Sequence, residues 1–194
     1  MSSSNLVFLA AAALLIFWAV GAYNRLVRLK NAMVKSFAQI EVQLKRRHDL
    51  VPALVEAART YLQHEPAALQ AVISAGNQAR SASDAARNRP GKTEAIMACA
   101  AAEQMLDSSL SRLFALAENC SDLTADPTLH ELNQELASLE NPLGFARQSY
   151  NDAVLDYNHA QSQFPALVVA RMFGFAPSPT LQAGQGLAGR QMNR

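Results

Sequence analysis

The sequence contains little cysteine, charge or aromatic side chain. Cys99 and Cys120 are the two cysteines among 194 residues, and their separation matches no metal-ligand spacing and excludes a disulfide scaffold. Charged residues are 17% of the chain and its net charge is +1, so no overall electric field favours nucleic acid as a partner. Because half of the residues are hydrophobic, a disordered polar chain is also excluded. The length predicts one domain.

The N-terminal region has no charge at all. From Leu6 to Ala22 the chain is apolar, and Trp18 and Tyr23 lie towards one end, as interfacial anchors do. This pattern predicts a single membrane span. A cleaved signal peptide is the alternative, because residues 20–22 resemble a cleavage site and the run is short for a span. Since residues 1–5 lack the basic group that a signal peptide carries, we favour an uncleaved anchor.

Basic residues follow the span and none precedes it. Those nearest to the span are Arg25, Arg28, Lys30 and Lys35. This bias predicts that the N-terminus lies outside and the rest of the chain in the cytoplasm, where both cysteines would stay reduced. Residues 23–60 carry a net charge of +5, which either serves only as the topology signal or also attracts the helix to anionic lipid.

The rest of the chain has the periodicity of helices. Apolar residues spaced alternately by three and four form an unbroken seam: Leu129, Leu132, Leu136, Leu139, Leu143, Ala146, Tyr150, Ala153, Tyr157, Ala160 and Phe164. Asp126 as N-cap and Pro127 at the first helical position mark its start, and Pro165 marks its end. Pro142 within it predicts a kink or a break.

Three further helices complete the pattern. The first continues from the span to Tyr61, with a second kink expected at Pro52. Its seam is predicted at Leu26, Leu29, Met33, Phe37, Ile40, Leu44, Arg47, Val51, Leu54, Ala58 and Tyr61. Two shorter helices begin at Pro66 and at about Lys92, separated by a loop over residues 87–91. The predicted fold is therefore all-α: an N-terminal transmembrane helix followed by an antiparallel bundle of two long and two shorter helices.

This pattern divides the chain into an anchor (1–22), a bundle (23–175) and a flexible tail containing Gly and Pro (176–194). A further short helix is expected over residues 166–173, before the tail. The tail is expected to be unstructured.

Two segments carry a family resemblance. Residues 23–56 read YNRLVRLKNAMVKSFAQIEVQLKRRHDLVPALVE, residues 139–158 read LENPLGFARQSYNDAVLDYN, and FPALVVARMFGF follows at 164–175. Together they resemble the LemA family of bacterial membrane-anchored helical-bundle proteins. The resemblance implies an exterior N-terminus, one span of the bacterial inner membrane and a cytoplasmic bundle. It implies no catalytic residues, and neither the middle of the chain (76–126) nor the tail contributes to it.

Polar residues on the two long helices form the candidate site. Arg47 falls on the apolar seam, where an unpaired charge is costly. We expect partners from the last long helix and hence a structural network that sets the register of the two helices. The members of this candidate network are Arg46, Arg47, His48, Asp49, Asn141, Arg147, Tyr150, Asn151, Asp152, Tyr157 and Asn158.

A catalytic or metal site built on His48 is the alternative. Adjacent helical residues point about 100° apart, so His48 and Asp49 do not readily form a pair. The sequence contains no G-x-S-x-G, P-loop, H-E-x-x-H or C-x-x-C motif. We therefore expect no enzymatic activity, no metal and no cofactor.

The leading functional hypothesis is a non-enzymatic, single-pass membrane protein whose bundle is an interaction or assembly module, with self-association as one form. Its partners are membrane lipid through the span and a protein that the sequence does not identify; nucleic acid is not expected. Alternatives are a membrane-binding or membrane-shaping role, which would use residues 166–173, and an adaptor for a membrane protease or secretion component. The adaptor would use the acidic residues between Glu118 and Glu140.

Overall fold

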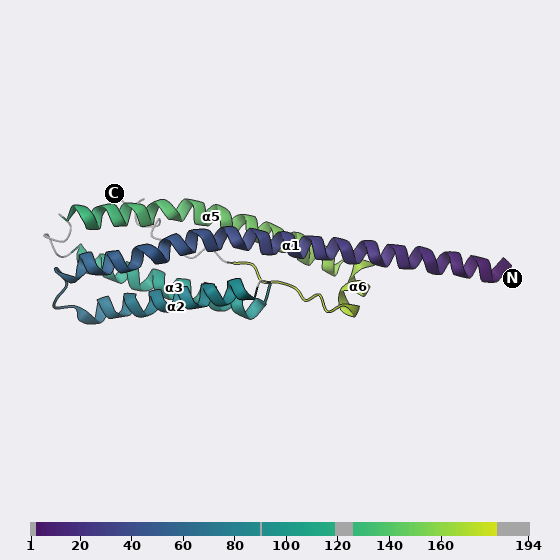
Figure 1. Cartoon of the computed structure of the whole chain (residues 1–194), viewed down its shortest axis with the longest axis horizontal. Coiled ribbons are helices and arrows are strands. Elements are labelled where there is room, and N and C mark those ends of the chain that lie inside the picture. Colours follow the sequence, from purple (N-terminus) through teal and green to yellow (C-terminus); the bar gives the residue numbers. More distant parts are fainter. Residues whose placement is uncertain (1–2, 90, 119–125, 182–194) are drawn as a thin grey trace.

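A computed structural model describes residues 3–89, 91–118 and 126–181 of the chain. In these ranges it contains helices and no strand, which confirms the all-α prediction. The helices are α1 (Ser3–Arg59), α2 (Pro66–Asn88), α3 (Thr93–Ala117), α5 (Pro127–Ser162) and α6 (Ala166–Met172). Figure 1 shows α1 running past the other helices at its N-terminal end, so that the molecule is a bundle with one projecting helix.

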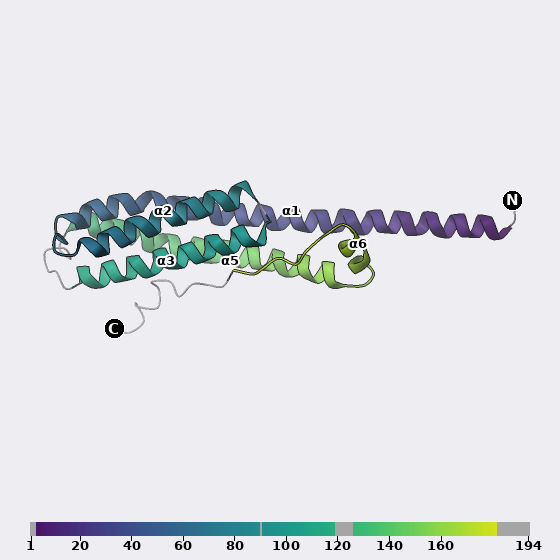
Figure 2. The same cartoon turned by 90° about the horizontal axis from the view of Figure 1, so that it is seen from below.

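Helix α1 has two parts that differ in their surroundings. Its first part is apolar, long enough to cross a membrane and buried nowhere in its most apolar stretch. From Leu26 onwards the same helix buries one face, at the seam positions predicted from the sequence: Leu26, Met33, Phe37, Ile40, Leu44, Arg47, Val51, Leu54 and Ala58. Figure 2 shows that the helix stays continuous between the two parts.

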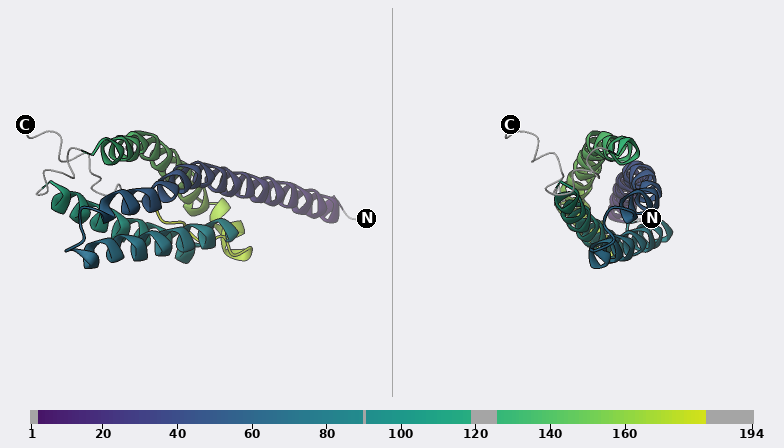
Figure 3. Two further views of the ribbon diagram at one scale, coloured as in Figure 1. Left: turned by 60° about the vertical axis from the view of Figure 1, so that its left-hand side comes forward. Right: turned by 90° about the vertical axis from the view of Figure 1, so that its left-hand side faces the viewer.

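The bundle is built from neighbouring antiparallel helices. Helix α1 packs against α5 and α2, α2 packs against α3, and the end-on view in Figure 3 shows them arranged around a common axis. Gly76 on α2 lets that helix approach α1 closely, because a Cβ there would lie 3.1 Å from Val51 Cγ1. Gly91 begins the turn into α3 with a φ of +78°, a conformation that L side chains rarely adopt.

Helix α5 begins as the sequence predicts. Asp126 Oδ1 accepts hydrogen bonds from the backbone N–H groups of Thr128 at 2.8 Å and Leu129 at 3.2 Å. Tyr61, just after α1, donates its hydroxyl to Asp126 Oδ2 at 2.9 Å, and this bond is the main cause that lowers the pKa of the Asp126 carboxyl. One carboxylate thus caps α5 and ties it to the end of α1.

Neither internal proline ends its helix. Pro52 lies within α1 and Pro142 within α5, and both helices continue on either side. Both prolines are exposed, so a carbonyl that loses its helical partner can meet water or a side chain instead. Of the two outcomes that the sequence predicts at Pro142, a kink or a break, the break therefore does not occur.

The predicted tail begins too early. After α6 the chain turns at Gly174 and runs back along α5 in an extended segment, residues 175–181, which we call the strap. Ser178 and Leu181 of the strap are buried. The expectation of an unstructured tail is therefore wrong for residues 176–181, while residues 182–194 lie outside the described residues.

Candidate functional site

A buried charge cluster joins α1 to α3. Arg47, with 2% of its surface exposed, donates to Glu103 Oε2 at 3.4 Å and forms a second ion pair with Asp107. Glu103 is likewise buried, and it lies one helical turn before Asp107 on α3. The prediction that a buried Arg47 needs a partner is confirmed, but the expectation that α5 supplies the partner is wrong.

The sequence held a signal for Glu103. The apolar seam of α3 runs through Ile96, Cys99, Leu106 and Leu110, and the step from the second to the third of these positions spans two helical turns. Glu103 fills that gap at helical spacing, as Arg47 does on α1. A basic residue on one seam and an acidic residue on another is the pattern that identifies such a pair.

His48 extends the cluster. Its Nε2 lies 2.6 Å from Glu103 Oε1, so both carboxylate oxygens of Glu103 are engaged. Asp49 faces elsewhere: it pairs with Lys45 at 3.2 Å and with Arg80 of α2 at 3.0 Å, and it is exposed. His48 and Asp49 therefore have separate partners, as adjacent helical residues should.

Arg80 also compensates for Pro52. A proline has no N–H to donate to the carbonyl four residues earlier, which here is that of His48. Arg80 donates to this carbonyl oxygen at 3.2 Å. The proline in α1 thus creates an acceptor that α2 uses.

A second network on α5 holds the strap. Asn151 Nδ2 donates to the Leu181 carbonyl at 2.8 Å while its Oδ1 accepts from the Leu181 N–H at 2.7 Å. Asn158 makes the same pair of bonds with Ser178, at 2.8 and 2.9 Å. Each amide side chain therefore binds backbone as a neighbouring β-strand would.

Two tyrosines add to this ladder. Tyr150 donates to the Pro179 carbonyl at 3.3 Å, and Tyr157 donates to the Ala176 carbonyl at 2.9 Å. Both rings are fully buried, and burial raises the pKa of the Tyr150 hydroxyl to about 12, so it remains a donor at neutral pH.

The spacing of the Tyr-Asn pairs explains why they fit the strap. The pair repeats after seven residues, which is about 10.5 Å along a helix. Its acceptors repeat after three residues of extended chain, which is about 10 Å. The seven-residue repeat on α5 therefore matches a three-residue repeat in the strap, running in the opposite direction.

Residues of both networks line one cavity of about 310 Å³. Glu103 and Asp107 of α3, Arg147 of α5 and Leu181 of the strap contribute to its wall, together with apolar residues of α1 and α3. Cys99 also lines it, and burial raises the pKa of this thiol to about 12. The thiol is therefore neutral at physiological pH and a poor nucleophile.

Comparison with known proteins decides the family. A model of the LemA family matches residues 36–192, most of the chain. The chain belongs to the LemA family. No curated protein matches it. The family match begins after the apolar part of α1 and extends beyond the described strap, so it covers the tail that the resemblance read from the sequence had left out.

Five of the candidate residues lie outside both networks of this LemA-like bundle. Arg46, Asp49, Asn141 and Asp152 are exposed, and Arg147 is half-buried at the cavity. The residues that the sequence grouped together thus divide into a charge cluster facing α3 and a ladder facing the strap. The partners that sequence reasoning missed are Glu103, Asp107, Arg80 and the backbone of the strap.

Two features of the LemA-like chain bear on ligand binding. Within the described ranges, no group of three or more His, Cys, Asp or Glu side chains is arranged to hold a metal ion. Residues 184–189 read GQGLAG, the glycine spacing of a dinucleotide-binding loop. This spacing indicates a dinucleotide site only where it follows a β-strand. Residues 126–181, which precede it here, contain no strand. Residues 184–189 themselves lie outside the described residues.

Proposed function

We propose that this protein is a non-enzymatic, single-pass protein of the bacterial inner membrane. In this proposal its helical bundle lies in the cytoplasm and acts as an interaction or assembly module that associates with further copies of itself. The proposal combines membership of the LemA family with the organisation of α1.

The observation that carries this proposal is the continuity of α1. One helix of 57 residues is apolar and unburied over its first part and packs against α2, α5 and α6 over its second. A flexible linker would let the bundle tumble freely at the membrane. A continuous helix instead holds the bundle in line with the span and at a fixed distance from the membrane, so that copies can meet at the same level in the plane of a membrane.

The polar clusters support a structural role over a catalytic one. The charges of Arg47, Glu103 and Asp107 bind one another, and His48 binds Glu103. A catalytic base or nucleophile must instead be free to contact substrate. The Asn and Tyr side chains of α5 are likewise engaged by the strap.

The surface of the bundle offers apolar contacts for assembly. Large apolar side chains that remain exposed there are Val42, Met97, Met105, Phe145 and Leu155. Phe145 is the most exposed of them, at 73% of its surface, and its neighbours Leu143 and Ala146 on α5 are buried in a core shared with α1. An aromatic side chain of this exposure is suited to a protein interface.

Photo-crosslinking in native membranes tests the proposal. A benzophenone amino acid replaces Phe145 in the full-length chain, and the matched control carries it at Asn77, an exposed position on α2. We expect crosslinked products of dimer mass from position 145 and none from position 77. Monomer as the sole species from position 145, at native expression levels, would contradict self-association through this surface.

A further inference from the structure

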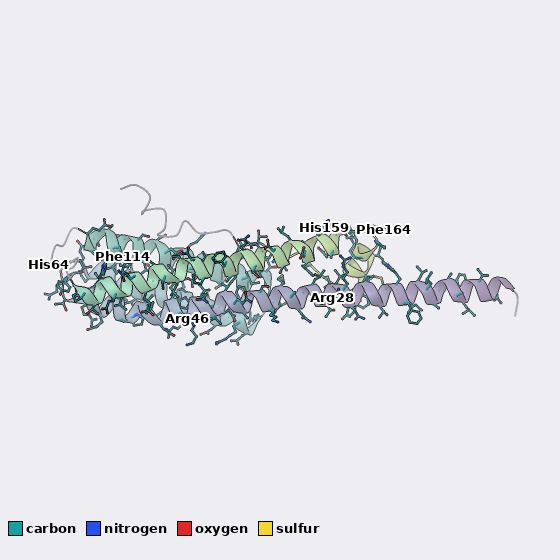
Figure 4. All side chains as sticks on the ribbon, turned by 90° about the horizontal axis from the view of Figure 1, so that it is seen from above. Arg28, Arg46, His64, Phe114, His159 and Phe164 are labelled. Atoms are coloured by element: carbon teal, nitrogen blue, oxygen red, sulfur yellow. The ribbon has the colours of Figure 1, made fainter. Side chains whose placement is uncertain are left out.

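The bundle reaches along α1 into the stretch that would lie in a membrane. The chain bends between α5 and α6, and we call residues 163–173 the elbow. Residues 163–166 of the elbow share a shallow pocket with Trp18, Gly21, Ala22 and Arg25 of α1. Figure 4 shows Phe164 at the end of the bundle from which α1 projects.

Contacts on the inner side of the elbow fix this position. Val169 and Ala170 of α6 are buried in a small core with Leu26 of α1, and Ala19 and Ala22 pack against the same core. After α6, Phe173 lies against Tyr23 with ring centroids 4.9 Å apart. The elbow is therefore packed on α1 between Trp18 and Leu26.

The length of the apolar run places this level inside the bilayer. The hydrocarbon core is about 30 Å thick and needs about 20 helical residues. The uncharged stretch extends from Leu6 to Asn24 and is followed by Arg25, so a span starting near Leu6 uses all of it. The elbow contacts α1 from Trp18 onwards, within the last two turns of that span. If α1 crosses the bilayer in this position, the elbow that is packed on it lies at the edge of the hydrocarbon core.

The side of the elbow that faces away from α1 is apolar, as a position in the bilayer requires. Phe164 is 83% exposed, Met172 75% and Phe173 60%, while Val168 is about half exposed. These side chains lie next to the unpacked part of α1, and they extend its apolar surface rather than forming a separate patch. Aromatic and long apolar side chains in this position are typical of a segment lying in a membrane interface.

The charge at this end fits a membrane with anionic lipids. Residues 1–40 and 157–181 contain no Asp or Glu. Arg25, Arg28 and Arg171 are exposed in these two stretches, and Lys30 is half-buried beside Phe175. An acid-free surface with basic side chains just beyond the apolar ones matches the order of acyl chains and headgroups in a leaflet.

We propose that the elbow is embedded in the leaflet on the bundle's side of the membrane, with Phe164, Val168, Met172 and Phe173 among the acyl chains. This proposal rests on the membrane anchoring that the proposed function includes. It gives the protein a second lipid contact beside α1. Two contacts at different positions around the axis of α1 fix the rotation of the bundle relative to the membrane, which one helix alone leaves free.

Depth-dependent quenching by brominated lipid tests the proposal. Trp18 is the single tryptophan, so Trp18→Phe gives a background into which one reporter is placed at a time. The full-length chain is reconstituted into phosphatidylcholine and phosphatidylglycerol vesicles whose acyl chains carry bromine. The reporters are Phe164→Trp in the elbow, Leu155→Trp on α5 and Phe17→Trp in the span. Leu155 is 58% exposed and lies nine residues along the chain from Phe164, about 14 Å if the path is helical.

We expect Phe164→Trp to lose fluorescence in brominated vesicles as Phe17→Trp does, and Leu155→Trp to lose none. Met172→Trp gives a second reading of the elbow if Phe164→Trp disturbs it, with far-UV circular dichroism as the check on folding. Quenching at position 17 without quenching at 164 and 172 would overturn the embedded elbow and leave the anchor intact. Absence of quenching at position 17 would instead contradict membrane anchoring, and with it both proposals.

Discussion

Arg47 places a positive charge in the interior of the bundle, and two carboxylates of α3 neutralise it. The ion pairs with Glu103 and Asp107 form where the side chains of Arg47 and Glu103 are almost fully buried. A buried ion pair adds little to the stability of the fold compared with a pair of apolar side chains. Removing one member, however, leaves an uncompensated charge in the core. Its value lies in specifying which helices meet, because an apolar seam alone does not distinguish α3 from α5.

Replacing Arg47 with Leu should therefore destabilise the protein by about 3 to 5 kcal/mol. The buried carboxylate of Glu103 would keep His48 as a partner, and the half-buried carboxylate of Asp107 would lose its ion pair. Thermal and urea unfolding of the full-length chain in detergent, followed by circular dichroism, measures the loss. The adjacent Arg46→Leu is the matched control and should change stability by less than about 0.5 kcal/mol, because Arg46 is exposed. Equal effects of the two substitutions would contradict the role given to the cluster.

At the scale of the helices, periodicity and capping residues were enough to predict the elements. The seam positions of α1 are buried, and Asp126 and Pro127 begin α5 as expected. Pairing was harder to predict, because helical periodicity specifies a buried face and says nothing of which helix covers it. The strap was missed for a similar reason: its two prolines resemble those of a loop, and the groups that hold it are side chains 14 to 30 residues away on α5.

The strap should detach when its amide partners are altered. Asn158→Asp keeps the acceptor for the Ser178 N–H but replaces the donor to the Ser178 carbonyl with a negative oxygen, which faces that carbonyl. Hydrogen exchange read by mass spectrometry should then show faster exchange in the strap, whereas the core of α5 keeps its protection. Asn141→Asp adds the same charge at an exposed position of α5 and should leave exchange in the strap unchanged.

At the scale of the whole molecule, charge is distributed along the long axis. At one end the projecting part of α1, the elbow and the strap contain no acidic residue, whereas Glu131, Glu135 and Glu140 lie towards the opposite end of α5. Figure 2 shows how far apart these ends are. In the proposed membrane anchoring, such a distribution would orient the chain during insertion, because positive charges close to a span resist translocation. It would also keep acidic side chains away from an anionic leaflet.

Orientation in the membrane should therefore depend on the basic residues nearest the span and not on those further along. We expect the end of the wild-type chain, marked by an epitope tag after Arg194, to be protected from protease added to spheroplasts. Inserting Arg-Arg-Arg after Met1 and replacing Arg25, Arg28, Lys30 and Lys35 with Gln should expose the tag in a substantial fraction of molecules, because the charge bias is reversed.

The control carries the same insertion with Lys45 and Arg46 replaced instead. These residues lie more than 20 positions beyond Ala22, outside the range in which charges orient a span, so its tag should stay protected. Equal exposure in the two variants would show that the charges near the span do not set the topology.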